Sequence, residues 1–371
     1  MRLLTLFATA FACALALPVE GLPIDIPKGI PGLKIPIPVG DLSDVILQGL
    51  FDQFQKKGGK KYANDDAKKK GLKTFGENVK KIAALQAKKF KTNVKFGINQ
   101  FTDLTDKEFA EQVLMKDTDQ PTSFVDYDRK NDSFIPRRNR PNRLQEDFAF
   151  DWRDTPYAVG PIRDQSSCGC CWAFTAASVI QSVYGIKNKK TIQPSEQQIC
   201  DCGMMDATSP GCNGGSSATA LQYAVKTGVS LEAFYTAYNP TRATKANMCD
   251  DKSKPNTIKI KSATQIYPAD DTEMAEALET YGPIAAAFKV GSSFRYYESG
   301  VFYDEDCNDP ATYLGGHAIS IVGYGEEDGW PYWIVKNSWG TSFGEDGYVK
   351  FAKGYDLCTM ESRRVVYAVP V

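Results

Sequence analysis

The spacing of apolar residues predicts helices in the first part of the chain and a mixture of helices and strands in the rest. Apolar positions recur at helical spacing over 41–57 and 68–90, with many lysines between and around them. Further helical runs follow Cys171 and span 273–281. Strand-like runs come late in the chain, at 283–288, 317–324 and 332–335. The pattern therefore predicts an α+β protein in which most helices precede most strands.

Three segments have the character of targeting signals or connections rather than of folded units. Residues 1–16 combine a basic residue, an apolar run and a small-residue end, which is typical of a cleaved secretory signal and is too short for a membrane anchor. Residues 17–40 are rich in proline and glycine and predict an extended linker. Residues 121–148 carry prolines, arginines and the glycosylation candidate Asn131, and predict an exposed connector. The expected folded units are 41–120 and 149–371.

Charge excludes some function classes and suggests a form of regulation. The chain has 44 basic and 45 acidic side chains, so it lacks the basic surplus typical of proteins that bind nucleic acid or an anionic membrane. The balance is uneven, because residues 17–148 carry a net charge of +5 and residues 149–371 carry −7. Opposite net charges attract the two regions to each other at neutral pH. Acid protonates carboxylates and weakens this attraction, which predicts that the two regions separate at low pH. The alternative is that the charges serve solubility and that apolar packing sets the contact.

The cysteines include one candidate nucleophile. Of ten cysteines, Cys13 lies in the predicted signal, and the odd number that remains leaves at least one thiol unpaired. Cys171 begins a predicted helix, where free backbone N–H groups and the helix dipole favour a thiolate. For any single cysteine of this cluster, the plainer alternative is a structural disulfide.

The only histidine of the chain, His317, is the only candidate for a catalytic imidazole. It stands between two glycines and an apolar strand-like run, a place where its ring can lie exposed at the start of a strand. The side-chain oxygen of Asn337 can fix the tautomer of such a ring, and Trp339 can shield their hydrogen bond from water. Taken alone, His317 is as easily a core residue and Asn337 a turn residue.

Together with their surroundings, these residues resemble papain and the cathepsins. The segment 165–174 resembles the nucleophile motif, and five further segments stand in the family's order along the chain. They are Asp151-Trp152-Arg153, Ser195-Glu196-Gln197, Gly211-Cys212-Asn213-Gly214-Gly215, the strand-like run that begins at His317, and Lys336-Asn337-Ser338-Trp339-Gly340-Thr341. The resemblance covers 149–371 and implies a papain-like fold, with a helical left subdomain and a β-barrel-like right subdomain on either side of the active-site cleft.

The resemblance also implies an activity and its residues. It implies a cysteine endopeptidase that hydrolyses peptide bonds through an acyl-thioester on Cys171, with His317 as acid and base and Asn337 beside it. Gln165 is expected to donate to the oxyanion together with the backbone N–H of Cys171. Exopeptidases of the family use additional histidine-bearing loops, and this chain has no second histidine, so an endopeptidase is expected.

The unit at 41–120 resembles the inhibitory propeptide of cathepsin L-like enzymes, which implies a zymogen. Phe75, Asn78 and Ile82 match the pattern of its long helix, and the segment Gly97–Asp103 matches its downstream motif. Three positions depart from the pattern. Ala67, Gly71 and Gln86 stand where Glu, Arg and Asn are usual.

Family pairing implies three disulfides and leaves two unusual thiols. The pairs are Cys168 with Cys212, Cys202 with Cys249, and Cys307 with Cys358. Cys170 stands where the family commonly has Ser, and Cys200 where it has an aliphatic residue. One hypothesis is that these two pair with each other. The alternative is that Cys170 stays free and can oxidise against Cys171.

By resemblance, the substrate pocket is lined mostly by small residues. The substrate-contacting positions are Gly214, Gly215, Ser216, Ser217, Ala287, Gly315, Gly316, Ala318, Trp339 and Arg363. Arg363 suggests that the pocket accepts an acidic side chain. If Arg363 turns to solvent instead, the pocket is roomy and apolar.

A metal-binding module and a catalytically silent relative are the two alternatives to a protease. A metal-binding module needs several close Cys or His ligands, and the implied disulfides leave too few, so no metal and no cofactor are expected. A catalytically silent relative that acts as a binding protein is the stronger rival, but such relatives typically lose one of the four catalytic residues. The expected partners are protein or peptide substrates and the chain's own propeptide, for a monomer in the secretory pathway, lysosomal or extracellular.

Overall fold

The computed structural model describes residues 43–116, 149–204, 211–250, 257–363 and 365–371, together with two short strands. These strands, β1 (Pro23–Ile24) and β2 (Ile35–Pro36), pair antiparallel with each other. The predicted secretory signal, the connector at 121–148 and the sequon at Asn131 lie outside the described residues. Among the described residues, no helix is long and apolar enough to cross a membrane.

The N-terminal unit (residues 43–116) is built on two crossing helices. Their bounds are α1 (Asp44–Gly58) and α2 (Asp65–Ala87), and both predicted helices are confirmed. The helix α2 begins earlier than the apolar pattern indicates because the side chain of Asn64 caps it, accepting a 2.9 Å hydrogen bond from the backbone of Ala67. The helices pack through three aromatic rings, with Phe75 5.4 Å from Phe51 and 5.1 Å from Phe54 between ring centroids.

Gly71, which departs from the propeptide pattern, makes room for an aromatic ring. A Cβ atom at Gly71 would lie 2.7 Å from the ring of Tyr62. The Tyr62 hydroxyl donates to Asp103 at 2.7 Å, and the Lys60 ammonium lies 2.9 Å from the other carboxylate oxygen. Tyr62 and Lys60 thus bind Asp103, and the ring of Tyr62 fills the space beside α2 that a larger residue at 71 would take.

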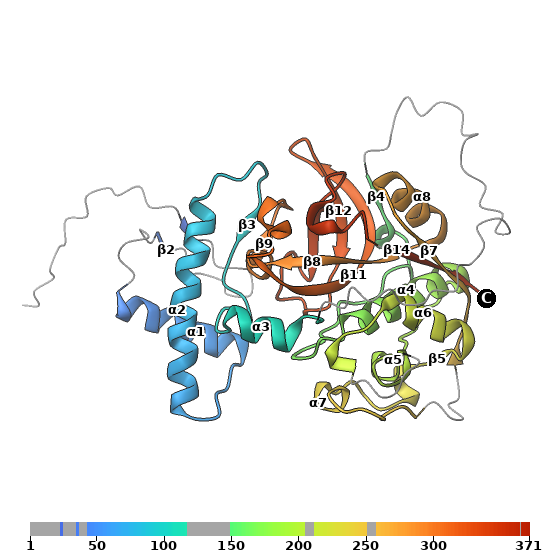
Figure 1. The fold of residues 1–371 in the computed structure, drawn as a ribbon, viewed down its shortest axis with the longest axis horizontal. Helices are drawn as coiled ribbons and strands as arrows, with labels where there is room; N and C mark the ends of the chain where they lie inside the picture. The colour runs from blue at the N-terminus through green and yellow to red at the C-terminus, as the bar shows by residue number, and fades with distance from the viewer. Residues whose placement is uncertain are drawn as a thin grey trace, which may run out of the picture.

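The C-terminal unit (residues 149–371) begins with a helical half. Its helices are α4 (Cys171–Asn188), α5 (Glu196–Cys202), α6 (Ser217–Lys226) and α7 (Pro240–Ala243). Two short strands, β5 (Val229–Ser230) and β6 (Thr257–Ile258), pair beside them. The central helix α4 is buried on nearly all sides, which explains why its sequence is apolar almost throughout. Figure 1 shows these helices in green and yellow on the side of the molecule away from α1 and α2.

The second half is a mostly antiparallel sheet. Its strand order is β10-β13-β12-β11-β8-β14-β7, and β4 also pairs with β11. The bounds are β4 (Phe150–Asp151), β7 (Ile260–Ile266), β8 (Ile284–Gly291), β10 (Val301–Phe302), β11 (Tyr313–Glu327), β12 (Trp330–Lys336), β13 (Tyr348–Ala352) and β14 (Val365–Pro370). The helix α8 (Asp271–Tyr281) precedes β8. The three predicted strands are confirmed as parts of β8, β11 and β12, and the predicted helix at 273–281 as part of α8.

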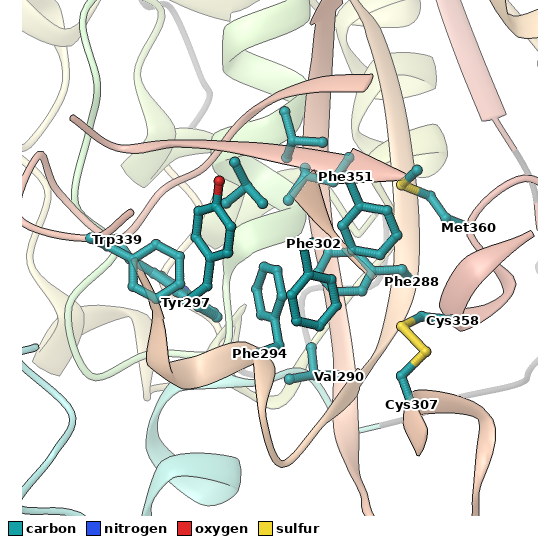
Figure 2. Close-up of a cluster of buried hydrophobic side chains, with 14 of the residues drawn as sticks. Phe288, Val290, Phe294, Tyr297, Phe302, Cys307, Trp339, Phe351, Cys358 and Met360 are labelled. Atoms are coloured by element: carbon teal, nitrogen blue, oxygen red, sulfur yellow. A yellow bond between two sulfur atoms is a disulfide. The ribbon is translucent and has the colours of Figure 1, made fainter. Parts of the chain in front are cut away.

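An aromatic core lies against the sheet and continues into the N-terminal unit. Figure 2 shows its rings together with the Cys307–Cys358 disulfide. Within it, Phe294 lies 5.1 Å from Phe302 and 5.7 Å from Trp339 between ring centroids. From the N-terminal unit, Phe101 and Phe109 approach Trp339 edge-on, at 5.2 and 5.6 Å. The two units therefore share one hydrophobic core.

The N-terminal unit also pairs with the sheet half through backbone and charge. Its strand β3 (Lys95–Phe96) runs antiparallel to β9 (Tyr297–Ser299). Nearby, Lys88 lies 3.7 Å from Asp304 and Lys91 lies 2.7 Å from Glu305. These pairs have the polarity that the opposite net charges predict, and the aromatic rings add apolar packing, so both kinds of interaction occur in the contact.

Candidate active site

Cys171 is the first residue of α4, and its thiol lies against the strand that carries His317. The backbone N–H of Ala318 donates to Sγ of Cys171 at 3.3 Å. The side chain is fully buried, and burial raises the pKa of the thiol to about 12 although the N–H of Ala318 acts in the opposite direction. This differs from the lowered thiol pKa that the helix start predicts, because exclusion of water outweighs the helix N-terminus in this closed state.

His317 lies on β11 with its two ring nitrogens in different surroundings. Its Nε2 lies 2.8 Å from Oδ1 of Asn337, while its buried Nδ1 has no hydrogen-bond partner among the described residues. The ring of Trp339 covers the imidazole, with 4.4 Å between centroids. Burial lowers the pKa of His317 to about 4, and the hydrogen bond to Asn337 opposes this shift. At neutral pH the imidazole and the Cys171 thiol are therefore both uncharged.

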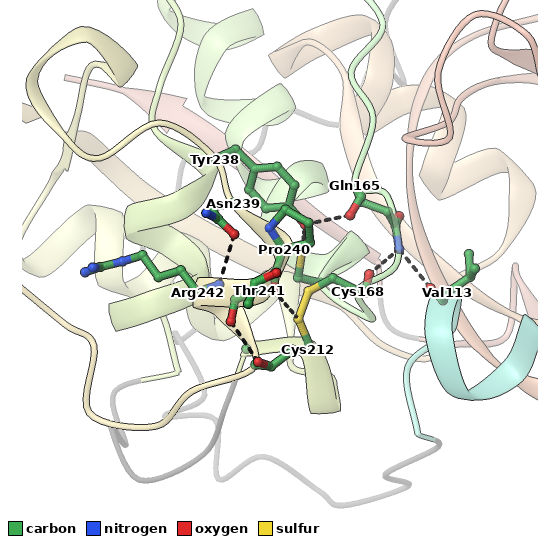
Figure 3. Close-up of a disulfide and its surroundings, with 12 residues drawn as sticks. Val113, Gln165, Cys168, Cys212, Tyr238, Asn239, Pro240, Thr241 and Arg242 are labelled. Atoms are coloured by element: carbon green, nitrogen blue, oxygen red, sulfur yellow. Dashed lines mark hydrogen bonds between the residues drawn. A yellow bond between two sulfur atoms is a disulfide. The ribbon is translucent and has the colours of Figure 1, made fainter. Parts of the chain in front are cut away.

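Gln165 uses its side-chain amide to hold the N-terminal unit. Its Nε2 donates at 2.8 Å to two carbonyl oxygens, those of Val113 and Cys168, as Figure 3 shows. Its Oε1 accepts a 2.7 Å hydrogen bond from the hydroxyl of Ser338, which fixes the orientation of the amide. A carbonyl of the N-terminal unit thus occupies a donor that the sequence assigns to the oxyanion.

The segment that follows Val113 lies against β11 and pairs with it through a single antiparallel bridge. Met115 exchanges two backbone hydrogen bonds with Gly316, at 3.0 and 3.1 Å. Side chains at the bordering glycines would collide with it, because a Cβ atom at Gly169 would lie 2.5 Å from the carbonyl oxygen of Leu114. At Gly315 the same distance to the Leu114 side chain is 3.0 Å. The glycines of the cleft therefore permit close approach of a peptide backbone.

The predicted pocket residues are only partly brought together. Ala287 and Ala318 are cross-strand neighbours on β8 and β11. Ser216 caps α6 with its hydroxyl, and the hydroxyl of Ser217 donates to the carbonyl of Trp172 at 3.0 Å, so both hydroxyls are engaged within the helical half. The guanidinium of Arg363 donates from Nε to Thr359 at 2.9 Å and is half-buried.

Three other predicted substrate-binding residues, Gly214, Gly215 and Trp339, contact parts of the protein itself. A Cβ atom at Gly215 would lie 2.5 Å from Met204, a neighbour that sequence reasoning missed. Gly214 has φ +109°, where glycine is favoured, and borders Met115. The ring of Trp339 lies over His317 and is buried by Phe101 and Phe109, in keeping with a shielding role for Trp339.

A buried polar cluster lies beneath the segment that carries Asn337. Arg163 pairs with the carboxylate of Glu196 at 2.9 Å and with Glu232. Burial raises the pKa of Glu196, and the nearby Arg163 opposes that shift. Lys336 donates to the hydroxyl of Ser178 at 3.3 Å, and burial lowers its pKa to about 8. Arg163, Glu196 and Lys336 line a small cavity that Asn337 also borders.

Three disulfides join the pairs that the family resemblance implies. They are Cys168–Cys212, Cys202–Cys249 and Cys307–Cys358, with Cα atoms 4.7, 4.8 and 5.2 Å apart. Cys170, Cys171 and Cys200 are free and buried. Sγ of Cys170 lies 3.1 Å from the hydroxyl of Tyr238, and the nearby Cys170 contributes to the raised pKa of Cys200.

Sequence reasoning missed the part of the N-terminal unit that fills the cleft. The segment Val113–Lys116 belongs to none of the motifs, and only its place between the last predicted propeptide motif and the connector could have indicated it. Arg295 was also missed. It is fully buried, which is rare for an arginine, and all of its described polar partners except the Tyr296 hydroxyl come from residues distant in sequence.

Known proteins match both units. The sequence model of the papain family cysteine protease matches residues 147–368, and that of the cathepsin propeptide inhibitor domain matches 51–109. Fruit bromelain of Ananas comosus is 34% identical over 311 residues, which cover 82% of this chain and 80% of the relative. Cysteine proteinase 1 of Dictyostelium discoideum is 34% identical over 330 residues, covering 84% of this chain and 90% of the relative.

Solved structures of proenzymes match most of this chain. Procathepsin L 3 of the Tenebrio molitor larval midgut has a TM-score of 0.72 and 26% identity, covering 87% of this chain and 99% of its own. A recombinant stem bromelain precursor has a TM-score of 0.70 and 30% identity, with the same coverages. The chain therefore belongs to the papain family of cysteine proteases and is made as a zymogen with a cathepsin-type inhibitory propeptide.

Proposed function

We propose that Cys171 is the nucleophile of this protease, His317 its general acid and base, and Asn337 the residue that orients the imidazole. The observation that carries this assignment is that the two ring nitrogens of His317 have different surroundings. Asn337 engages Nε2, and Nδ1 is left without a partner among the described residues on the strand that contacts the Cys171 thiol. An imidazole held in this way can accept the thiol proton at Nδ1.

The reaction that follows uses each of these groups in turn. Nδ1 of His317 accepts the thiol proton while Sγ of Cys171 attacks the peptide carbonyl carbon. The oxyanion that forms accepts hydrogen bonds from Nε2 of Gln165 and from the backbone N–H of Cys171. The imidazolium then protonates the leaving amine, and the C–N bond breaks to give an acyl-thioester. His317 next takes a proton from water, and the resulting hydroxide attacks the thioester carbon. The C–S bond then breaks to release the acid, and the imidazolium returns its proton to Sγ of Cys171.

The N-terminal unit is the inhibitory propeptide, and occupancy of the cleft explains latency. Val113 takes the Gln165 donor, and Met115 takes the backbone donor and acceptor of Gly316. A substrate cannot bind these groups until the propeptide leaves. We infer that residues 1–16 are removed as a secretory signal and that cleavage within 121–148 frees the enzyme, in a lysosomal or extracellular setting.

The substrate side of the proposal is a preference for internal peptide bonds. His317 is the only histidine, so the chain lacks a second one to hold a substrate's C-terminal carboxylate. Arg363 favours an acidic side chain at one place in the substrate, directly N-terminal to the residue whose carbonyl carbon is attacked. This requires that the guanidinium of Arg363 turns from Thr359 to the pocket. A substrate library in which Arg363→Ala changes nothing at that place excludes this preference.

One labelling experiment tests the catalytic assignment against a silent relative. Acid-processed protein is treated with a thiol-directed epoxide and with a peptide substrate. We expect one label per chain, hydrolysis of the peptide, and loss of both in Cys171→Ala. Absence of label and of hydrolysis in the wild-type protein, after complete removal of the propeptide, identifies a silent homologue.

A further inference from the structure

Arg295 of the peptidase domain is an arginine whose guanidinium is surrounded by the propeptide. It lies in the short helix η4 (Phe294–Tyr296) and is fully buried. Its Nη1 donates to the carbonyl of Leu104 at 3.1 Å, and its Nη2 donates to Oδ1 of Asn78 at 3.0 Å. The same Nη2 forms an ion pair with Oδ1 of Asp106 at 3.0 Å. Of its described polar partners, only the Tyr296 hydroxyl comes from the peptidase domain.

The propeptide presents these oxygen atoms in fixed orientations. Nδ2 of Asn78 donates to the carbonyls of Thr102 and Leu104, at 2.8 Å each, so its Oδ1 must face Arg295. Lys81 binds Oδ2 of Asp106 at 2.9 Å, which leaves Oδ1 for Arg295. The site is therefore built for a guanidinium before the two parts meet, and preformed sites lose little entropy on binding.

The same contact is mechanically joined to the catalytic cleft. Asp106 is the first residue of α3 (Asp106–Val113), and Val113, whose carbonyl accepts from Gln165, is the last. This helix has 8 residues and spans about 12 Å at about 1.5 Å per residue. A capping box between Thr105 and Glu108 stabilises its first turn. Anchoring at Arg295 thus fixes one end of a rigid element whose other end blocks the oxyanion donor.

We propose that Arg295 is the residue by which the peptidase domain recognises its own propeptide. Its guanidinium recognises two propeptide groups together, the amide oxygen of Asn78 and the carboxylate of Asp106. This rests on the inhibitory role proposed above for the propeptide. Arg295 is fully buried, so removing an acidic partner leaves its charge buried and without that partner, which is costly. Arg295 therefore selects a propeptide that carries these oxygens and rejects one that does not, while the rings of Phe101 and Phe109 supply affinity without selectivity.

The test uses the full chain with Cys171→Ala, so that it cannot process itself, and a site-specific protease sequence placed within 121–148. After cleavage, the propeptide is held only by noncovalent contacts, and its dissociation rate is measured by size exclusion. We expect Asp106→Asn to speed dissociation by at least about tenfold. Glu111→Gln is the matched control, since it removes one negative charge from the exposed face of the same helix, where Glu111 pairs only loosely with Lys107 at 3.8 Å. It should leave the rate unchanged.

Two further variants separate recognition from general weakening. Lys81→Met measures how much of the change in dissociation rate comes from loss of the Lys81–Asp106 ion pair alone. The double variant Arg295→Met with Asp106→Leu should dissociate at least about tenfold more slowly than the product of the two single effects predicts. The proposal is overturned if the dissociation rate of the double variant equals the product of the two single effects. It is also overturned if Asp106→Asn and Glu111→Gln dissociate at the same rate. Each cleaved complex is first shown to elute intact, so a misfolded variant is recognised as such.

A parallel measurement keeps this proposal distinct from the inhibitory role. In the cleaved chain with Cys171 intact, reaction with a thiol-directed epoxide is followed while the propeptide dissociates. If the wild-type complex reacts before the propeptide leaves, the inhibitory role fails whatever Arg295 does. If reaction awaits dissociation but Asp106→Asn dissociates at the wild-type rate, only the recognition role of Arg295 fails.

Discussion

The carbonyl oxygen of Val113 accepts a 2.8 Å hydrogen bond from Nε2 of Gln165, the group that we assign to the oxyanion of the reaction. The propeptide thus binds the stabilising donor of the enzyme, and the same residue serves latency and catalysis. Ser338 holds the amide in place through its hydroxyl, 2.7 Å from Oε1 of Gln165.

Removing the side-chain amide of Gln165 should lower the turnover number strongly and should change substrate binding little. In Gln165→Ala we expect kcat to fall by about 10²–10³, the usual loss for one oxyanion donor, with KM changing little. Ser338→Ala, which frees the amide to rotate but keeps the donor, should lose less. Steady-state kinetics on a peptide substrate, normalised to sites titrated with a thiol-directed epoxide, checks both. An unchanged kcat in titrated Gln165→Ala removes Gln165 from the oxyanion site.

Burial of His317 should make release of the propeptide dependent on acid. Burial lowers the pKa of His317 to about 4 in the closed cleft, whereas an exposed imidazole titrates near its usual 6.5. Above 6.5 neither state binds the proton, and the closed state has its full stability. As the pH falls from 6.5 to 4, the open state gains the proton and the closed state loses up to about 3 kcal/mol. Below 4 both states are protonated and the loss is complete.

The dissociation rate of the cleaved propeptide, measured from pH 8 to pH 4 in the Cys171→Ala chain, checks this window. We expect the rate to rise mainly between pH 6.5 and 4, and His317→Gln to flatten that rise. High salt screens exposed pairs such as Lys91–Glu305 but not a buried ring. A rise that persists in His317→Gln and disappears in high salt assigns the acid response to the opposite net charges of the two parts instead.

The Tyr62 ring should make Gly71 intolerant of a side chain. In Gly71→Ala the new Cβ would meet the ring at 2.7 Å, and we expect a loss of about 1–3 kcal/mol in unfolding free energy. Combining it with Tyr62→Ala should remove the clash, so that the double variant loses less than the sum of the single variants. Gly49→Ala in α1 is the control, since its Cβ would meet nothing within 4 Å and should stabilise the helix by about 0.5–1 kcal/mol.

Thermal unfolding of the full Cys171→Ala chain measures all four variants. Equal losses in Gly71→Ala and in the double variant contradict the steric reading of this position. Tyr62→Phe completes the series, because it keeps the ring and removes only the hydroxyl that donates to Asp103. It should cost about 1 kcal/mol.

The catalytic residues could be recognised from sequence because their chemistry is local and rare. A single histidine, a cysteine at a helix start and an amide in a fixed motif need no three-dimensional information to be selected as candidates. The long helices α1 and α2 were also predictable, since each buries one apolar face of regular period. The short helix α3 was not, because its burial rests on two residues, Phe109 and Val113, that contact the other unit.

What the sequence could not supply is the pairing of distant groups. The site of Arg295 joins three segments of the chain, and no periodicity links them. Likewise, the departure at Gly71 has its explanation in Tyr62, a residue outside the helix pattern. The thiol pKa of Cys171 was predicted with the wrong direction for the zymogen because the helix start is visible in the sequence, whereas the burial that dominates is not.

The buried thiols of Cys170 and Cys200 should remain reduced. Burial, and next the contact with Cys170, raises the pKa of Cys200 well above its usual value, so the thiolate needed for disulfide exchange is scarce. Maleimide added to the unfolded, non-reduced zymogen, made without residues 1–16 and therefore without Cys13, should modify three cysteines per chain, namely Cys170, Cys171 and Cys200. A disulfide between Cys170 and Cys200 leaves only Cys171 to be modified.

A valine at position 200 separates the two states independently of the absolute count. If both thiols are free, Cys200→Val lowers the number of modified cysteines from three to two. If they are paired, the same change liberates Cys170 and raises the number from one to two. Cys170→Ser is the companion variant, because its hydroxyl can keep the contact with Tyr238 while removing the sulfur next to the nucleophile. Mass spectrometry of the labelled chains gives the count directly, and a rise in Cys200→Val establishes the fourth disulfide.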